Sequence, residues 1–393
     1  MIRTAAALAV ALMAGVAPAA FAQAARPAAS PPKVSVPPIP FVERTLKNGL
    51  KVYTALDRST PTVTVQVWYG VGSKDDPQGR SGFAHLFEHM MFKATRDMAA
   101  ETMDRLTEDV GGQNNASTWD DFTNYYEVIP SNHLERLLWA EAQRMSSLKV
   151  DQPNFTSERA VVEEELRQSY LANPYGRLEL ASANAAYETH PYKRSGIGSL
   201  GDLDAATLPD VKAFHDTYYR PQNASLIVIG DFDQKTLDAW IDRDFGDIKN
   251  PAAPLPRVTV KEPLRTSPKL VNAYGPIVPL PAVRILWHIP AAADPDYPAL
   301  AVLDAVLSAG KSSRLYDRLV YRDQLAQRVN SDAGRNAQPG LFEFEAVLAG
   351  GKTVAQGEAA LMAEAKAVRE APVSEIELAR AKTQLIANLL HQR

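Results

Sequence analysis

Segments with the two-residue periodicity of strands alternate along this chain with segments of helical periodicity. The first strand signals are residues 41–57, which an Asn48-Gly49 turn divides into two, and residues 60–73, where β-branched and aromatic residues alternate. The segments that follow are helical at 81–95, 99–110, 133–148 and 156–173, and strand-like at 114–130 and 224–230. This order predicts an α+β fold.

The same alternation returns more faintly in residues 269–393. Strand patterns at 283–291 and 341–349 alternate there with helical patterns at 297–321 and 373–393. Proline and charge collect between the two passes, at 250–268, which predicts a domain boundary. We therefore predict repeated αβ domains of roughly 200 residues each, an N-terminal domain at 41–250 and a second at 269–393. The second copy looks C-terminally incomplete, because the chain stops inside a helical pattern with no closing strand.

The first 22 residues have the pattern of a secretory signal peptide. Arg3 gives a basic start, an apolar run extends from Ala5 to Val16, and Ala20-Phe21-Ala22 offers a cleavage site. A retained membrane anchor is the alternative, but the apolar run is short for a bilayer span. Residues 23–40 hold six prolines and predict an extended linker. We expect an exported protein, periplasmic or secreted, without a membrane span after cleavage.

Composition narrows the chemistry that this chain can perform. It contains no cysteine, so disulfides and thiolate zinc sites are excluded, and any metal must be held by histidine and carboxylate groups. The formal net charge is −4, which gives no broad basic surface for nucleic acid.

One short stretch, SGFAHLFEHMMF at 81–92, concentrates three groups that can bind a metal or move a proton. On a helix that begins near Ser81 as N-cap, His85 and His89 project from one face. Glu88 is offset from them, which suits a general base better than a ligand. The order H-x-x-E-H belongs to zinc peptidases. The alternative is a chance pairing of core histidines, whose burial without partners costs free energy.

A third ligand must come from another segment, and the helical run at 156–173 offers four candidates. These are Glu158, Glu163, Glu164 and Glu165. Glu158 and Glu165 are seven apart and share a helix face, whereas Glu163 and Glu164 suit a solvated face. Spacing alone does not choose among the four. We expect Thr156 or Ser157 to cap this helix.

These motifs resemble the pitrilysin or insulinase (M16) family of zinc peptidases, which includes mitochondrial processing peptidase. In that family H-x-x-E-H is followed by a glutamate ligand about 76 residues later, the position of Glu165, within a stretch that resembles ERAVVEEEL. The resemblance implies repeated αβ domains of the LuxS/MPP-like type and one zinc ion per chain. It implies His85, His89 and Glu165 as ligands, Glu88 as the catalytic base, and Glu158 as a catalytic-site carboxylate that orients the ligands.

The segment NASTWDDFTNYYEV resembles a hairpin of the same family, N-A-x-T…T-N-Y-Y. In relatives its first strand is an exposed edge to which the substrate peptide adds as a further strand. The resemblance therefore implies that Asn115, Ala116, Ser117 and Thr118 bind substrate. Asn115 as a turn residue and Tyr125 as a packed strand aromatic remain the alternatives.

One departure from the family concerns the Arg and Tyr, seven apart, that relatives bring to the scissile carbonyl. The matching segment here is SSRLYDRLVYRDQLAQRV, which places Val320 and Gln327 at those positions, with Arg318 and Tyr321 out of register. The clamp is therefore expected from a partner subunit or from a missing C-terminal half. The resemblance implies a zinc-dependent endopeptidase for peptides or small unfolded proteins. The alternative is a non-catalytic peptide-binding or assembly subunit, although such subunits usually lose the H-x-x-E-H residues.

Overall fold

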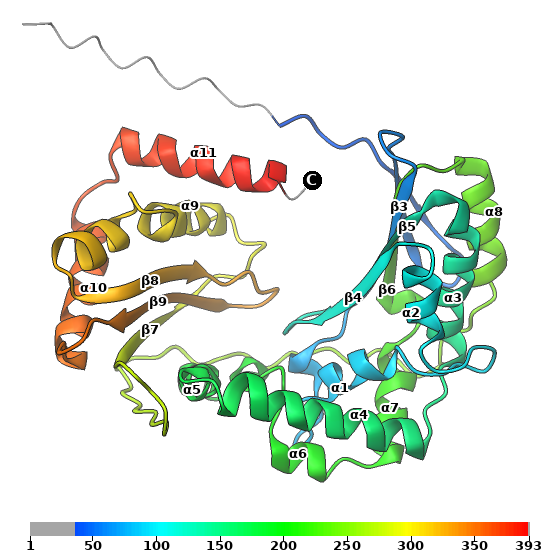
Figure 1. Ribbon diagram of the computed structural model, residues 1–393, viewed down its shortest axis with the longest axis horizontal. Helices are drawn as coiled ribbons and strands as arrows, with labels where there is room; N and C mark the ends of the chain where they lie inside the picture. Colours follow the sequence, from blue (N-terminus) through cyan, green and yellow to red (C-terminus); the bar gives the residue numbers. More distant parts are fainter. Residues whose placement is uncertain (1–35, 392–393) are drawn as a thin grey trace, which may run out of the picture. The chain divides into compact units, whose positions relative to one another are not determined.

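The computed structural model of the chain describes residues 36–391 and confirms the α+β prediction with two β-sheets and their helices (Figure 1). The predicted signal peptide at 1–22 and most of the predicted linker at 23–40 lie outside the described residues. Residues 36–40 contain no helix or strand. Within 36–391, no helix combines the length and the apolar composition that crossing a bilayer requires.

The first half of the chain builds a six-stranded sheet in the order β1-β2-β6-β3-β5-β4. Its strands are β1 (Val42–Thr45), β2 (Lys51–Leu56), β3 (Thr62–Tyr69), β4 (Gln113–Thr118), β5 (Thr123–Pro130) and β6 (Ala224–Gly230). Neighbouring strands pair antiparallel except β2 and β6, which run parallel. The predicted β1–β2 hairpin is confirmed, and Gly49 takes a φ of 88°, which glycine adopts without a Cβ clash. β4 forms one edge of the sheet.

Helices of the first half enclose one hydrophobic core on this sheet. They are α1 (Phe83–Met90), α2 (Thr102–Glu108), α3 (Leu134–Ser147), α4 (Gln152–Glu165), α5 (Gly176–Ala186), α6 (Leu200–Asp204), α7 (Leu208–Tyr218) and α8 (Gln234–Phe245). α3 and α8 cover one face of the sheet (Figure 1), and Val63, Val65 and Val67 of β3 are buried in the core. The short turns η1 (Ser73–Asp75) and η4 (Pro191–Lys193) and the π-helical turn η3 (Leu166–Leu171) connect these elements.

The second half forms a three-stranded antiparallel sheet in the order β7-β9-β8. Its elements are β7 (Ala282–Ile289), α9 (Tyr297–Ser308), the π-helical turn η6 (Tyr316–Arg322), β8 (Ala326–Ala333), β9 (Gly340–Leu348), α10 (Val354–Glu370) and α11 (Glu375–His391). α9 lies between this sheet and α11 (Figure 1). Phe342, Phe344 and Leu361 belong to its core, which is separate from the first.

The segment between the halves, where the sequence predicts a domain boundary, lacks regular secondary structure. Residues 246–281, all of which the structure describes, contain no helix or strand. In the sequence, one large core precedes this segment and the other follows it: the first is built from residues between 50 and 245, and the second from residues between 283 and 361. The division into domains at 41–250 and 269–393 nevertheless stays a prediction.

Both predicted helix caps are wrong. Gly82 rather than Ser81 precedes α1, and Ser81 instead donates its backbone N–H to Asp202 Oδ2 at 3.0 Å. The first N–H groups of α1 are satisfied by Asp76, which accepts from Gly82 N at 2.7 Å and from Ala84 N at 2.8 Å. Helix α4 begins a full turn before Thr156, because Asp151 caps it by accepting from Asn154 N.

Candidate active site

Helix α1 presents His85, Glu88 and His89 on one side because its other side is apolar. The two imidazole rings lie with their centroids 4.8 Å apart, as the spacing of four residues predicts. The apolar positions of α1 are at most 1% exposed and anchor the helix in the core: Phe83, Leu86, Phe87 and Met90. The histidines are therefore held by a rigid element.

Helix α4 brings two glutamates to these histidines. Glu165 Oε2 lies 3.4 Å from His89 Nε2 and 3.7 Å from His85 Nε2. Glu158 Oε2 lies 3.8 Å from His89 Nδ1, on the other side of that ring. The seven-residue spacing of the two glutamates places both on the helix face that meets α1.

The other two glutamates of the run pair along their own helix. Glu163 forms ion pairs with Arg159 at 3.7 Å and with Arg167 at 3.3 Å. Glu164 accepts a hydrogen bond from Gln168 Nε2 at 2.7 Å. Glu163 and Glu164 therefore pair with residues of their own segment and not with the histidines. Residue spacing alone does not distinguish them from Glu158 and Glu165.

The donor atoms of His85, His89 and Glu165 fit a metal ion. All three lie within 4.8 Å of one another, and no other trio of His, Asp or Glu side chains in residues 36–391 shares such spacing. Ligands about 2.0–2.1 Å from a tetrahedral zinc ion lie roughly 3.4 Å apart, close to the 3.4 and 3.7 Å from Glu165 to the two rings. Two imidazoles and one carboxylate, with one open position, are the donor set of hydrolytic zinc sites.

The two histidines differ in the direction of their pKa shifts and in their partners. Burial, with a smaller contribution from His89, lowers the pKa of His85 to about 3, so its imidazole is neutral, as a metal ligand must be. Burial alone would lower the pKa of His89, but Glu158, Glu88 and Glu165 together raise it. His89 Nδ1 faces Glu158, whereas His85 Nδ1 is buried without a hydrogen-bond partner among the described residues.

Glu88 is fixed by a neighbour on the edge strand. Thr118 Oγ1 donates to Glu88 Oε2 at 2.6 Å. Burial raises the pKa of Glu88, while the hydrogen bond from Thr118 acts in the opposite direction. One carboxylate oxygen is thus held by the threonine. The family resemblance implies Thr118 as a substrate-binding position, and nothing in the sequence indicates this contact with Glu88.

Lys93 is a further site residue that sequence reasoning missed. Its Nζ lies 3.0 Å from Glu158 Oε1, and the Glu158 side chain is 6% exposed. Glu158 therefore lies between a lysine and His89, and although burial raises its pKa, these two partners lower it overall. The only signal was the spacing of four residues between His89 and Lys93.

The predicted substrate-binding residues Asn115, Ala116, Ser117 and Thr118 all lie on β4. β4 pairs with β5 on one side and ends the sheet on the other. Asn115 is a strand residue and not a turn residue, and its Oδ1 accepts from Ala116 N at 2.8 Å. Tyr125 of β5 is fully buried and shares a hydrogen bond with Tyr219, which supports its alternative as a packed aromatic.

The segment expected to lack the Arg and Tyr clamp lies in the second half. Val320 packs against the second core, and Gln327 is exposed at the start of β8. Of the two residues out of register, Arg318 pairs with Glu364, while Tyr321 is 74% exposed. The two positions that align with the clamp, Val320 and Gln327, therefore carry neither a cationic nor a phenolic group.

The chain matches known peptidases in sequence. Residues 51–199 match the family model described as insulinase (peptidase family M16), and residues 205–385 match the model described as peptidase M16 inactive domain. A Helicobacter pylori protein named zinc protease PqqE is 33% identical over 351 residues, 88% of this chain and 78% of that protein. A probable mitochondrial-processing peptidase subunit beta from Arabidopsis thaliana is 24% identical over 88% of this chain and 66% of that protein.

Solved structures show the same likeness. The crystal structure of a protease from Helicobacter pylori has a TM-score of 0.86 and 31% identity over 90% of this chain and 85% of that chain. Pitrilysin has a TM-score of 0.68 and 21% identity over 86% of this chain, but only 37% of pitrilysin is covered. The periplasmic protease PqqL from Escherichia coli has a TM-score of 0.69 and 20% identity, with 40% of that chain covered. The last two likenesses concern the fold alone.

Proposed function

This chain belongs to the insulinase family of peptidases, family M16, and from that premise we propose that it is a zinc-dependent endopeptidase for peptides or small unfolded proteins. The observation that carries the proposal is the trio His85, His89 and Glu165, whose donor atoms lie within 4.8 Å of one another beside Glu88. The name of the Helicobacter pylori relative, zinc protease, supports the choice of metal.

His85, His89 and Glu165 would hold one zinc ion per chain, which when bound would supply the positive charge that polarises the scissile carbonyl. Glu88 acts as general base and accepts a proton from the attacking water. Thr118 holds Glu88 Oε2, so Oε1 is the oxygen that accepts the proton. Glu88 then returns this proton to the amine that leaves.

Glu158 orients one ligand in this mechanism. Its Oε2 faces His89 Nδ1 at 3.8 Å, and its Oε1 pairs with Lys93 at 3.0 Å. A carboxylate at the second nitrogen of a ligating histidine fixes the tautomer and the ring orientation. Lys93 keeps that carboxylate charged and in place.

The substrate would bind as an added strand along β4, at Asn115–Thr118. β4 is an edge of the sheet, and an edge strand presents unpaired backbone groups to an extended peptide. Recognition through the backbone selects for extended, flexible chains rather than for one side chain.

The Arg and Tyr clamp would come from a second M16-type half or subunit. Val320 and Gln327 cannot replace an arginine and a tyrosine at a developing oxyanion. The chain spans only 37% of pitrilysin and 40% of PqqL, two proteins that share its fold. Longer proteins with this fold therefore have room for a second half, which supports the proposal. The predicted signal peptide and the periplasmic neighbour PqqL support a periplasmic location.

A non-catalytic peptide-binding or assembly subunit is the second candidate. The observation that favours it is the match of residues 205–385 to a model described as an inactive domain. The two candidates differ in whether Glu88 is needed, because peptide binding to β4 does not require a proton acceptor.

The test compares metal content and peptide cleavage in matched variants. We expect about one zinc per wild-type chain by elemental analysis, lost in Glu165→Gln and kept in Glu88→Gln and in Glu164→Gln, an exposed glutamate of the same helix. Cleavage of a quenched fluorescent peptide, with the candidate partner half present, should be lost in Glu165→Gln and Glu88→Gln only. A wild type without metal sinks the proposal, and metal binding with Glu88-independent peptide binding but no cleavage favours the assembly subunit.

A further inference from the structure

The turn between β4 and β5 is held by polar contacts from distant parts of the chain. We call residues 119–122 the β4–β5 turn and residues 334–339, which join β8 to β9, the β8–β9 loop. The β4–β5 turn directly follows Thr118, the residue that donates to Glu88. Whatever fixes this turn therefore acts one residue from the site.

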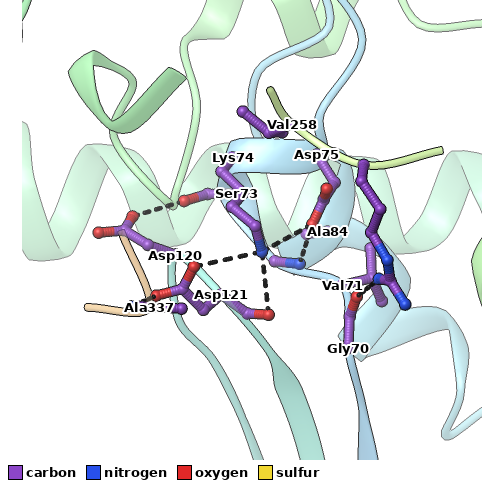
Figure 2. A network of polar contacts seen from close by, with 12 residues as sticks. Gly70, Val71, Ser73, Lys74, Asp75, Ala84, Asp120, Asp121, Val258 and Ala337 are labelled. Carbon is purple, nitrogen blue, oxygen red and sulfur yellow. Dashed lines mark hydrogen bonds and ion pairs between the residues drawn. The ribbon is translucent and has the colours of Figure 1, made fainter. Parts of the chain in front are cut away.

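The first set of contacts comes from η1, as Figure 2 shows. Ser73 N donates to Trp119 O at 3.0 Å, and Ser73 Oγ donates to Asp120 Oδ1 at 2.7 Å. Lys74 Nζ lies 3.3 Å from Asp121 Oδ1 and donates to the Asp121 carbonyl at 3.1 Å. η1 thus binds both the backbone and the carboxylates of the turn.

The approach of η1 to the turn is close enough to require glycine. A Cβ at Gly72 would lie 2.1 Å from Trp119 O and 2.5 Å from Asp120 O, both backbone atoms that cannot move aside. The glycine directly before η1 is therefore required by the contact with the turn.

The second set of contacts comes from the β8–β9 loop, which belongs to the other half of the chain. Asn336 Nδ2 donates to Asp120 Oδ2 at 3.0 Å, and Ala337 N donates to Asp121 Oδ2 at 2.7 Å. Figure 2 places Ala337 beside Asp121 on the side away from Lys74. Each aspartate of the turn is thus bound from both halves of the chain.

Tyr192 of η4 joins the two loops. Its hydroxyl donates to Asp121 Oδ1 at 2.7 Å and accepts from Gln338 N at 3.1 Å. The groups involved are nearly out of solvent, with the side chains of Lys74 and Asp121 12% and 14% exposed. At such low exposure, charged hydrogen bonds are screened little by water and hold their partners firmly.

The same segment also reaches the start of the catalytic helix. Asp76, which follows η1, accepts hydrogen bonds from Gly82 N and Ala84 N at the first turn of α1. Glu88 is thus bounded by two elements that meet at η1: α1, which carries it, and β4, whose Thr118 holds its carboxylate.

We propose that Tyr192 and the β8–β9 loop are positioning residues for the peptidase reaction: they fix the β4–β5 turn and, through Thr118, hold Glu88 where it accepts the proton. This inference rests on the proposed function. It gives the second half of the chain, which matches a model described as an inactive domain, a part in building the active site.

Two neighbouring tyrosines provide a matched test in the full chain. Tyr192→Phe removes the hydroxyl that joins Asp121 to Gln338. Tyr187→Phe is the control, because Tyr187 packs in the same cluster and its hydroxyl donates to Pro339 O at 3.2 Å, in the same loop, and not to a residue of the turn. Both variants lose a hydrogen bond to the β8–β9 loop, but only one loses a bond to the β4–β5 turn.

We expect Tyr192→Phe to lower kcat roughly tenfold, part of the 10²- to 10⁴-fold that a general base contributes, with zinc content unchanged. Tyr187→Phe should stay within about twofold of wild type. The amide hydrogens of residues 118–122 should exchange roughly tenfold faster in Tyr192→Phe only. Because the effect passes through Thr118, Tyr192→Phe should cost little more in a Thr118→Ala background, a non-additivity that a purely structural role would not produce.

The outcomes separate this inference from the proposed function. An active wild type whose two tyrosine variants lose activity alike, or whose Tyr192 and Thr118 effects are additive, overturns this inference alone. A wild type that cleaves no peptide even with the candidate partner half present overturns the proposed function, and this inference about catalysis is then wrong as well.

Discussion

Arg144, Glu127 and Glu141 form a buried cluster that makes stability depend on pH. All three side chains are 0% exposed. Arg144 Nη2 donates to Glu127 Oε1 at 2.8 Å and also to Glu141 Oε1. One guanidinium thus serves two carboxylates, and burial together with the charge of Glu141 raises the pKa of Glu127 well above its usual value.

Glu127→Gln should therefore flatten the dependence of the unfolding free energy on pH. The folded protein keeps a proton on Glu127 that the unfolded chain releases above its usual pKa of 4.5. The stability that this proton provides is fully present below that pH and is lost as the pH rises towards the folded-state pKa. The slope is at most about 1.4 kcal/mol per pH unit, so above about pH 4.5 the wild type should lose stability with rising pH relative to Glu127→Gln.

Urea unfolding followed by circular dichroism at several pH values measures this difference directly. The glutamine oxygen still accepts from Arg144, so the variant keeps the packing of the cluster. The control is Glu135→Gln, on helix α3 that carries Arg144; the Glu135 side chain is 51% exposed. It should change the unfolding free energy by less than about 0.5 kcal/mol at each pH. Parallel curves for wild type and Glu127→Gln would refute the reasoning.

Three further perturbations follow from the structure. Arg144→Met leaves Glu127 and Glu141 buried without the guanidinium that donates to both and should cost about 3–5 kcal/mol at neutral pH, measured by urea unfolding; a loss below about 1 kcal/mol, the size of a surface substitution, contradicts it. Glu158→Gln should weaken zinc binding about 10- to 100-fold in competition with a chromophoric chelator, whereas Glu163→Gln on the same helix should not. Gly72→Ala should lower the melting temperature, because its Cβ would lie 2.1 Å from Trp119 O; an unchanged melting temperature counts against the close approach.

The part of the site that lies on one helix could be predicted from the sequence. A separation of four residues fixes the relative direction of two side chains on a helix, so the pairing of His85 with His89 needed no tertiary information. The choice among the four glutamates of α4 did need it. Glu158 and Glu165 share a face, but only the packing of α4 against α1 decides that this face meets the histidines. The resemblance to the family supplied that choice before the structure did.

Sequence periodicity does not predict a strand whose apolar and polar residues do not alternate. β8 reads AQRVNSDA, a mostly polar stretch without strict alternation, and it pairs with β9 through a register shift between Ala326 and Arg328. The helical pattern at 297–321 predicts a continuous helix, but α9 ends at Ser308, Gly310 takes a φ of 79°, and a separate π-helical turn follows at Tyr316–Arg322. Periodicity marks where apolar side chains fall and is a weak guide to where a helix ends.

Contacts between distant segments lie beyond what the pattern of one segment reveals. Asp120 and Asp121 look like an ordinary polar turn in the sequence, and their partners Asn336 and Ala337 are each 216 positions away. The buried ion cluster around Arg144 was invisible for the same reason. Charged residues on a helix and a strand read as surface positions unless their partners are known.

Thr118 shows how an edge strand can serve two roles at once. Successive side chains of a strand point to opposite faces, so Ala116, which packs against the first core, and Thr118 share a face, while Asn115 lies on the other. The backbone edge of β4 stays open to a peptide while the Thr118 hydroxyl binds Glu88. On the proposed function, an added peptide strand would stiffen the strand that holds the base. Substrate docking and base positioning then depend on the same six residues of β4, and a variant that loosens β4 should change both KM and kcat.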